Sequence, residues 1–189
     1  MAKYSLGYAS ITFDQRNSGV ADIRNDYQPF MNSKEPTEYK MVHDALVAAE
    51  ILRDQPEIDP NRIAYAGESN GGRFATIACA LDPMAHGAIA ISSCGYGIDA
   101  MIRPGKLNDL NTIRFYRSID PDTYLSLIPP REFIMIHSLK DPIIPFEYAN
   151  QTYAMAYDPK SLQIVECDKH GYCTEMNAFL EKDLTNVFS

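Results

Sequence analysis

The chain has 189 residues, the size of one ordinary domain, and its content of 46% apolar and 22% charged residues excludes disorder as its main state. The 25 acidic residues outnumber the 17 basic ones, and the net charge of −8 argues against a nucleic-acid partner and against an anionic membrane surface. No apolar stretch is long enough to span a bilayer and the first residues show no signal peptide, so the sequence predicts a cytoplasmic protein.

The first half of the chain alternates between strand and helix patterns. Residues Tyr8–Phe13 read as a strand, and a turn-rich polar segment follows to about Lys34. Apolar residues recur at helical spacing from Val42 to Leu52, which predicts a helix. A second strand is predicted at Ile63–Ala66. A second helix, with its apolar face between Phe74 and Leu81, then follows a pair of glycines.

The second half continues the alternation. Residues 94–131 are less regular and form a short insertion in the position of a small cap, with a short helix around Pro121–Leu127. Strands are predicted at Ala88–Ser92, Glu132–His137 and Leu162–Glu166. Helices are predicted from Pro145 to about Tyr157 and from Met176 to Val187.

Strands that alternate with helices in this way are typical of an α/β fold with a mainly parallel sheet, here of about five strands, and helices on both faces. The strands at 88–92 and 132–137 are uniformly apolar, as expected for strands buried on both sides. No internal repeat, low-complexity tract or flexible linker divides the chain, so a single domain over residues 1–189 is predicted.

The cysteines give no sign of a metal centre. They are Cys79, Cys94, Cys167 and Cys173, and none forms a Cys-x-x-Cys pair. Histidine, cysteine and aspartate lack metal-ligand spacing, so neither a metal nor a cofactor is predicted. Cys167 and Cys173 flank a histidine and could meet across a short loop, but nothing in the sequence indicates an oxidising compartment. Four reduced thiols are therefore expected.

The most specific chemical signal is the run Gly67-Glu68-Ser69-Asn70-Gly71-Gly72, which lies between a predicted strand and a predicted helix. In this context G-x-S-x-G indicates a nucleophile elbow, a strained turn that lifts the serine hydroxyl out of the sheet. The turn is tight, so the residues two before and two after Ser69 are expected to be very small. The helix N-terminus favours negative charge, and the N–H of Asn70 can face a developing oxyanion.

A serine nucleophile needs a histidine base and a carboxylate that orients the histidine. Asp141 follows the predicted strand at 132–137, and His170 follows the predicted strand at 162–166. Carboxyl ends of parallel strands share one edge of a sheet, which is where open α/β sheets place their sites. We therefore predict the triad Ser69, Asp141 and His170. Asp168 is a rival acid, but it stands two residues from His170 on one loop and is badly placed to orient that ring.

These segments resemble a known superfamily. The block Asp59–Ala75 closely resembles the nucleophile-elbow block of α/β-hydrolases, His137–Asp141 resembles the segment that carries their acid, and His170-Gly171 resembles their terminal His-Gly. The cues Asp-Pro-x-Arg-Ile, the doubled glycine and Asp-x-Ile-x-Pro are most similar to the dienelactone hydrolase and prolyl-oligopeptidase branch. The resemblance implies the α/β-hydrolase fold and the order serine, acid, histidine.

The resemblance also implies a missing front. In the superfamily, three strands precede the one that resembles Tyr8–Phe13, and a glycine-rich loop after the third supplies a second oxyanion donor. That third strand lies between the strands that correspond to Tyr8–Phe13 and Arg62–Ala66. These two segments are thus expected either to pair directly or to expose their edges, and exposed edges bind partners. We expect an N-terminally truncated fold that can form a homo-oligomer through its sheet edges.

Together the motifs predict a serine hydrolase that cleaves a carboxylic ester or a related small acyl substrate through an acyl-enzyme on Ser69. Glu68, Tyr96 and Tyr172 are candidate substrate-binding residues beside the predicted triad. Peptidase and acyltransferase chemistry would use the same triad and stay open as alternatives. A further alternative is a catalytically weak interaction module, in which the unpaired sheet edges recruit a partner and the triad is a relic.

Overall fold

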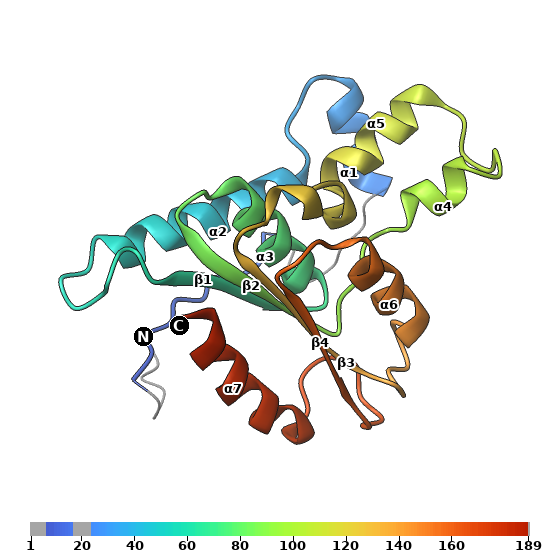
Figure 1. Cartoon of the computed structure of the whole chain (residues 1–189). Helices are drawn as coiled ribbons and strands as arrows, with labels where there is room; N and C mark the ends of the chain where they lie inside the picture. Colours follow the sequence, from blue (N-terminus) through green and yellow to red (C-terminus); the bar gives the residue numbers. More distant parts are fainter. Residues whose placement is uncertain (1–6, 17–23, 189) are drawn as a thin grey trace.

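The centre of the fold is a parallel sheet. The computed structural model describes residues 7–16 and 24–188 (Figure 1). Four strands pair in the order β1-β2-β3-β4, namely β1 (Ile63–Glu68), β2 (Ala85–Ile91), β3 (Glu132–Ser138) and β4 (Lys160–Val165). All three pairings are parallel, and the register places Ile89 of β2 beside Ile134 of β3. The α/β class and the parallel sheet predicted from the sequence are confirmed.

Helices cover both faces of the sheet, as predicted (Figure 1). One face packs α2 (Thr37–Arg53), α3 (Asn70–Leu81) and α6 (Phe146–Met155) against a core that includes Met41, Phe74, Phe133 and Met135. The opposite face packs α7 (Asn177–Val187) over Ile89, Ile134 and Ile136. Strands β2 and β3 are buried along most of their length because both faces are covered.

The segment 94–131 contains more helix than the sequence predicts. Its helices are α4 (Ile98–Ile102) and α5 (Leu110–Ile119), and the short helix expected near 121–127 is present as two 3₁₀ turns, Pro121–Thr123 and Leu125–Leu127. A third 3₁₀ turn, Thr174–Met176, precedes α7. Helix α5 is capped by Asp109, whose carboxylate accepts from the N–H of Thr112, and the helix buries Phe115 and Ile119.

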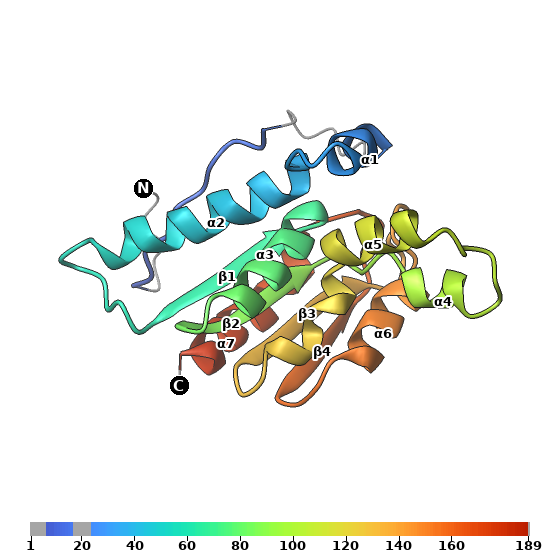
Figure 2. The ribbon, with the colours of Figure 1, turned by 90° about the horizontal axis from the view of Figure 1, so that it is seen from above.

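Helix α1 (Arg24–Met31) lies where a polar loop was expected, so that expectation is wrong. Its sequence contains Pro29, and the helical spacing of Tyr27, Phe30 and Met31 extends over little more than one turn. The helix is held by tertiary contacts, because the rings of Tyr27 and Phe30 pack on Phe115 with centroids 5.5 and 5.3 Å apart. Figure 2 shows α1 and α5 side by side at the end of the sheet where β1 ends.

The strand predicted at Tyr8–Phe13 is not formed. Only Ala9 makes a bridge, and neither the strand order nor the register of the sheet includes this segment. The described sheet therefore has four strands instead of about five, with β1 at one edge. Tyr8 instead stacks on Phe188, just beyond α7, while Phe13 stays 42% exposed. A strand pattern without a neighbouring backbone to pair with does not make a strand. Part of the turn predicted after it, at 17–19, lies outside the described residues.

None of the helices within 7–16 and 24–188 is both long enough and apolar enough to cross a bilayer.

Candidate active site

Ser69 stands at the junction of β1 and α3 in a conformation that L residues rarely adopt, with φ 55° and ψ −120°. A Cβ at Gly67 would overlap the carbonyl of Gly71, so the small residue predicted two positions before Ser69 is confirmed. At Gly71 a Cβ would meet no other atom within 4 Å, and the steric reason predicted for that position is wrong. Gly72 carries the constraint instead, because a Cβ there would lie 2.6 Å from Cβ of Ser93.

His170 connects the serine to the acid. Its Nε2 lies 2.7 Å from Oγ of Ser69, and its Nδ1 lies 2.9 and 3.0 Å from the two carboxylate oxygens of Asp141. In this arrangement the Ser69 hydroxyl donates to Nε2, while the Nδ1–H donates to Asp141. The structure thus brings together the three residues predicted as a triad, from the ends of β1, β3 and β4. Asp168 is exposed, and the carboxylate that meets His170 is that of Asp141.

Asp141 is held in its ionised form by its own loop. The N–H groups of Ile143 and Ile144 both donate to Oδ1 at 2.9 Å. Burial disfavours the carboxylate, but these two N–H groups and the His170 imidazole outweigh burial and lower the pKa of Asp141 below its ordinary value. The loop is fixed by His137, which is fully buried and donates from Nε2 to the carbonyl of Ile144 at 2.9 Å. The acid therefore presents a fixed negative charge to His170.

Asn70 is the first residue of α3, and the N–H groups of a first helical turn have no acceptor inside the helix. Its side chain is held by Arg73, whose Nη1 donates to Oδ1 of Asn70 at 2.7 Å and whose Nε donates to the carbonyl of Cys94 at 2.7 Å. The guanidinium also lies 4.1 Å from the ring centroid of Tyr96. Burial raises the pKa of Tyr96 to about 12, so its hydroxyl stays neutral. Tyr96 thus packs on the residue that braces the candidate oxyanion donor.

The loop that carries His170 is fastened at several points. Ser138 Oγ donates to the carbonyl of Cys167 at 2.6 Å and accepts from its N–H at 2.9 Å. Ser92 Oγ donates to the carbonyl of Gly171 at 3.2 Å. Glu68 accepts from the N–H of Tyr172 at 2.8 Å. The predicted substrate-binding residues Glu68 and Tyr172 therefore contact each other across the elbow and the histidine loop.

A disulfide joins Cys167 to Cys173 and closes this loop, so the expectation of four reduced thiols is wrong. Cys79 and Cys94 are buried free thiols. The sequence allows Cys167 and Cys173 to meet across a short loop. Reduced thiols were expected because nothing in the sequence indicates an oxidising compartment. The sulfur atoms and the Glu175 carboxylate form one group with metal-ligand spacing within the described residues. The disulfide removes both thiolates that such a site would use.

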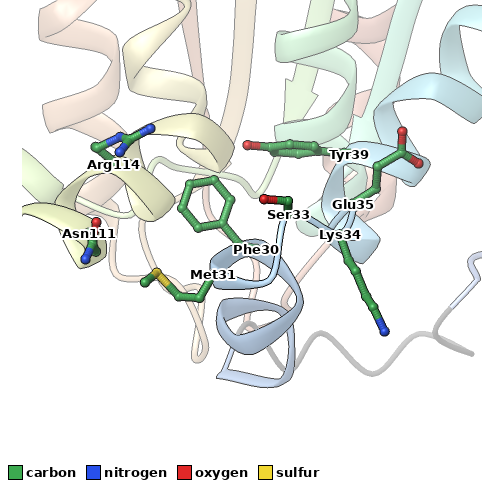
Figure 3. Close-up of a pocket in the computed structure, with 8 residues that line it drawn as sticks. All are labelled: Phe30, Met31, Ser33, Lys34, Glu35, Tyr39, Asn111 and Arg114. Atoms are coloured by element: carbon green, nitrogen blue, oxygen red, sulfur yellow. The ribbon is translucent and has the colours of Figure 1, made fainter.

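A cavity of about 410 Å³ lies apart from the triad. Figure 3 shows Arg114 of α5 and Tyr39 of α2 on opposite sides of the Phe30 ring. Its lining residues come from α1, the connection to α2, α2 itself and α5, and they are Phe30, Met31, Ser33, Lys34, Glu35, Tyr39, Asn111 and Arg114. None of these is a triad residue, and sequence patterns had not singled them out.

Comparison with known proteins assigns the chain to a family. The sequence profile of the acetyl xylan esterase (AXE1) family matches residues 27–122, about half of the chain. The chain belongs to the acetyl xylan esterase family. The matched region contains the elbow with Ser69 and ends before Asp141 and His170.

Curated relatives of this family member include an uncharacterized protein, YfhR, from Escherichia coli (strain K12). It is 25% identical over 156 residues, which cover 77% of this chain and 51% of the relative. YfhR from Salmonella typhi is 24% identical over 152 residues, which cover 71% of this chain and 49% of the relative. The chain thus spans about half the length of the curated relatives it matches.

Solved structures confirm the α/β-hydrolase fold of this acetyl xylan esterase family member. An acetyl xylan esterase from Paenibacillus sp. R4 matches with a TM-score of 0.68 and 17% identity, covering 80% of this chain and 53% of that one. Acetyl Xylan Esterase 1 from Thermoanaerobacterium sp. JW/SL YS485 matches with a TM-score of 0.62 and 12% identity, covering 96% and 60%. The acylaminoacyl peptidase of Pyrococcus horikoshii matches with a TM-score of 0.53 and 20% identity, covering 82% and 28%.

Proposed function

We propose that this chain is a serine hydrolase that cleaves a short carboxylic ester, with an O-acetylated carbohydrate as its substrate class. The observation that carries the proposal is the position of His170, whose two ring nitrogens contact Ser69 and Asp141 at 2.7 and 2.9 Å. The acetyl and carbohydrate parts of the proposal rest on the family and on the printed names of solved relatives.

The proposed reaction has two stages. Ser69 Oγ attacks the ester carbonyl carbon while its proton passes to Nε2 of His170. The imidazolium then returns that proton to the departing alcohol oxygen, which leaves an acetyl group on Ser69. In the second stage water attacks the acetyl carbonyl, His170 takes a proton from the water, and acetate leaves as Ser69 recovers its proton. Neither stage requires a cofactor.

Two groups stabilise the charges that develop along this path. Asp141 faces the His170 ring, so it stabilises the imidazolium and fixes the tautomer with the proton on Nδ1. The N–H of Asn70, at the start of α3, is the proposed donor to the oxyanion, and the α3 N-terminus adds a favourable dipole. Loss of one oxyanion donor typically costs about 2.7–4 kcal/mol in the transition state. Turnover therefore depends on how many donors the site supplies.

Peptidase action is the second candidate, because the same triad serves amide hydrolysis and the solved relatives include the acylaminoacyl peptidase. The leaving group distinguishes the two reactions. We expect the chain to hydrolyse p-nitrophenyl acetate and an acetylated xylo-oligosaccharide, and to leave the p-nitroanilide of an acetylated amino acid intact. Faster cleavage of the anilide than of both esters would assign the chain to the peptidases instead. Transfer of the acetyl group to an added alcohol would indicate acyltransferase action.

The direct test of the proposal is Ser69→Ala, which removes the attacking oxygen. We expect turnover of p-nitrophenyl acetate to fall by about 10³-fold or more, since a triad nucleophile is worth up to about 10⁶-fold in the best studied case. Circular dichroism and thermal unfolding of the variant check that its fold is intact. Unchanged turnover in a folded Ser69→Ala variant would exclude Ser69 as the nucleophile.

A further inference from the structure

We propose that Glu68 is a positioning residue that holds the histidine loop, residues 167–173, against the nucleophile elbow. This inference rests on the proposed function of Ser69 and His170. Glu68 is the last residue of β1 and stands directly before Ser69. Its carboxylate accepts the N–H of Tyr172, two residues after His170, at 2.8 Å. One side chain therefore connects the backbone of the nucleophile to the backbone of the base.

Gly171 lies where the histidine loop and the nucleophile elbow approach each other closely. Its φ is +87°, a value that side-chain-bearing residues rarely adopt, and a Cβ there would overlap the Glu68 carboxylate. The positive φ favours a glycine between His170 and Tyr172, and the Glu68 carboxylate fills the space where a Cβ would lie. This packing lets the Glu68 oxygen reach the N–H of Tyr172.

Apart from the contact between Ser69 and His170 themselves, the other hydrogen bonds that hold the loop do not start from the elbow. Ser138 holds the backbone of Cys167, Ser92 bonds to the carbonyl of Gly171, and the disulfide closes the loop on itself. The hydroxyl of Tyr172 donates to Oδ1 of Asn177 at 2.6 Å, which secures the far side of the loop to α7. These contacts fix the loop to β2, β3 and α7. Beside the Ser69–His170 contact, Glu68 adds a second connection to the segment that carries the attacking oxygen.

Position matters here because proton transfer needs Nε2 of His170 within hydrogen-bond reach of Ser69 Oγ. A displacement of about 1 Å in a catalytic geometry can cost about 100-fold in rate. Glu68 touches neither reacting atom, so its contribution acts through His170. Hydrogen bonds to a charged acceptor are about twice as strong as those between neutral groups, which suits a contact at an exposed site.

The test compares Glu68→Ala with Glu68→Gln. Alanine removes the acceptor, and we expect kcat for p-nitrophenyl acetate to fall about 10- to 100-fold with KM within about twofold. Glutamine keeps an acceptor oxygen of the same reach, so we expect kcat within about threefold of the parent value. Glu166→Ala is the matched control: it removes an exposed carboxylate directly before the loop, where its contact is with Lys140 rather than with loop backbone. We expect Glu166→Ala to leave kcat unchanged.

A second measurement tests the contact between Glu68 and Tyr172 without measuring turnover. Hydrogen exchange of the Tyr172 amide, measured by NMR, should be faster in Glu68→Ala and unchanged in Glu68→Gln. The proton on Nδ1 of His170, which resonates at low field when it bonds to a carboxylate, should broaden in Glu68→Ala alone. These signals report the position of the loop, which a general loss of stability would not change selectively.

The outcomes separate this inference from the proposed function. An unchanged kcat in Glu68→Ala, or an equal loss in Glu68→Gln, would overturn the positioning role. A change confined to KM would assign Glu68 to substrate binding, as the sequence predicts, and would also overturn it. If the parent chain shows no turnover that depends on Ser69, the proposed function fails, while unchanged exchange at Tyr172 would still overturn the contact with Glu68.

Discussion

At the scale of single residues, the identity of the triad acid depends on what surrounds each carboxylate. Asp141 is buried, accepts two backbone N–H groups and faces Nδ1 of His170. Asp168 is exposed on the histidine loop itself. The sequence predicted Asp141 because it follows a different strand from His170, and two strand ends can face each other whereas close neighbours on one loop rarely do.

We expect Asp141→Asn to slow acylation by up to about 10⁴-fold, because an amide can donate to the ring and favour the wrong tautomer. Asp168→Asn serves as the control, and its acylation rate should stay within about twofold of the parent rate. The measurement is the single-turnover release of p-nitrophenol from p-nitrophenyl acetate. Equal losses, or a larger loss at Asp168, would mean that Asp141 is not the orienting acid.

Two carboxylates away from the candidate site, those of Asp26 and Glu38, are expected to make the free energy of unfolding depend on pH. Glu38 is buried, and burial, followed by its hydrogen bond to Asp26 and the charge of Asp26, raises its pKa to about 8. The folded chain therefore keeps a proton that the unfolded chain releases above about pH 4.5. Stability from this group is complete below that pH and is lost as pH rises toward 8. Burial disfavours the charged form of Asp26, but its hydrogen bonds to Glu38 and Thr37 outweigh burial and lower the pKa of Asp26. Its contribution to stability is therefore present above about pH 3.8 and is lost as the pH falls below that value.

We expect the thermal midpoint of the parent chain to decrease between pH 5.5 and 8.5, by roughly 2–4 °C for each kcal/mol lost. Glu38→Gln, which cannot ionise and can still donate to Asp26, should decrease less over the same range. Glu57→Gln removes an exposed carboxylate and should follow the parent chain. If Glu38→Gln and the parent chain decrease equally, Glu38 does not carry this pH dependence.

At the scale of elements, the G-x-S-x-G pattern predicted the local structure of the elbow but not the contacts it makes with distant segments. The pattern G-x-S-x-G predicted the strand, the turn and the helix around Ser69, because this local geometry follows from the backbone alone. It did not reveal that Ser93, just after β2, presses on Gly72. That contact depends on the packing of two segments distant in sequence, which no local pattern encodes.

We expect Gly72→Ala to be destabilising by about 1–3 kcal/mol, the usual cost of an overpacked site, since its Cβ would enter the space of Ser93. Gly71→Ala should change the free energy of unfolding by less than about 1 kcal/mol, because its Cβ meets nothing and Ala suits a helix. Urea unfolding of the two variants makes the comparison. A greater loss in Gly71→Ala than in Gly72→Ala would contradict the packing described for α3.

At the scale of the whole molecule, strand and helix alternation predicted the class, the parallel sheet and the edge on which the triad lies. Four of the five predicted strands are confirmed. Those at β2 and β3 were recognisable because their residues 88–91 and 133–136 are all apolar. Helix α1 was not predicted, and the strand predicted at Tyr8–Phe13 is not formed. Both depend on partners distant in sequence: α1 forms against α5, whereas Tyr8–Phe13 has no strand to pair with in the described sheet.

We propose that β1, one of the two edge strands of the described sheet, mediates association between copies of the chain. An unpaired strand edge offers N–H and C=O groups to a second backbone. We expect light scattering to give a molar mass above that of the 21.2 kDa chain, decreasing on dilution. Ala66→Lys adds a charge at an exposed β1 position and should shift the population toward the monomer. A parent chain that stays monomeric at all concentrations would exclude association through β1.

In the proposed mechanism, His170 and Asp141 activate Ser69 to form an acyl-enzyme. The most direct measurement is mass spectrometry of the chain after brief mixing with p-nitrophenyl acetate and an acid quench. We predict one acetyl group on the peptide that contains Ser69, and its absence in both Ser69→Ala and His170→Ala. Hydrolysis of the ester without an acetyl group on Ser69, or with equal labelling after His170→Ala, would contradict the account.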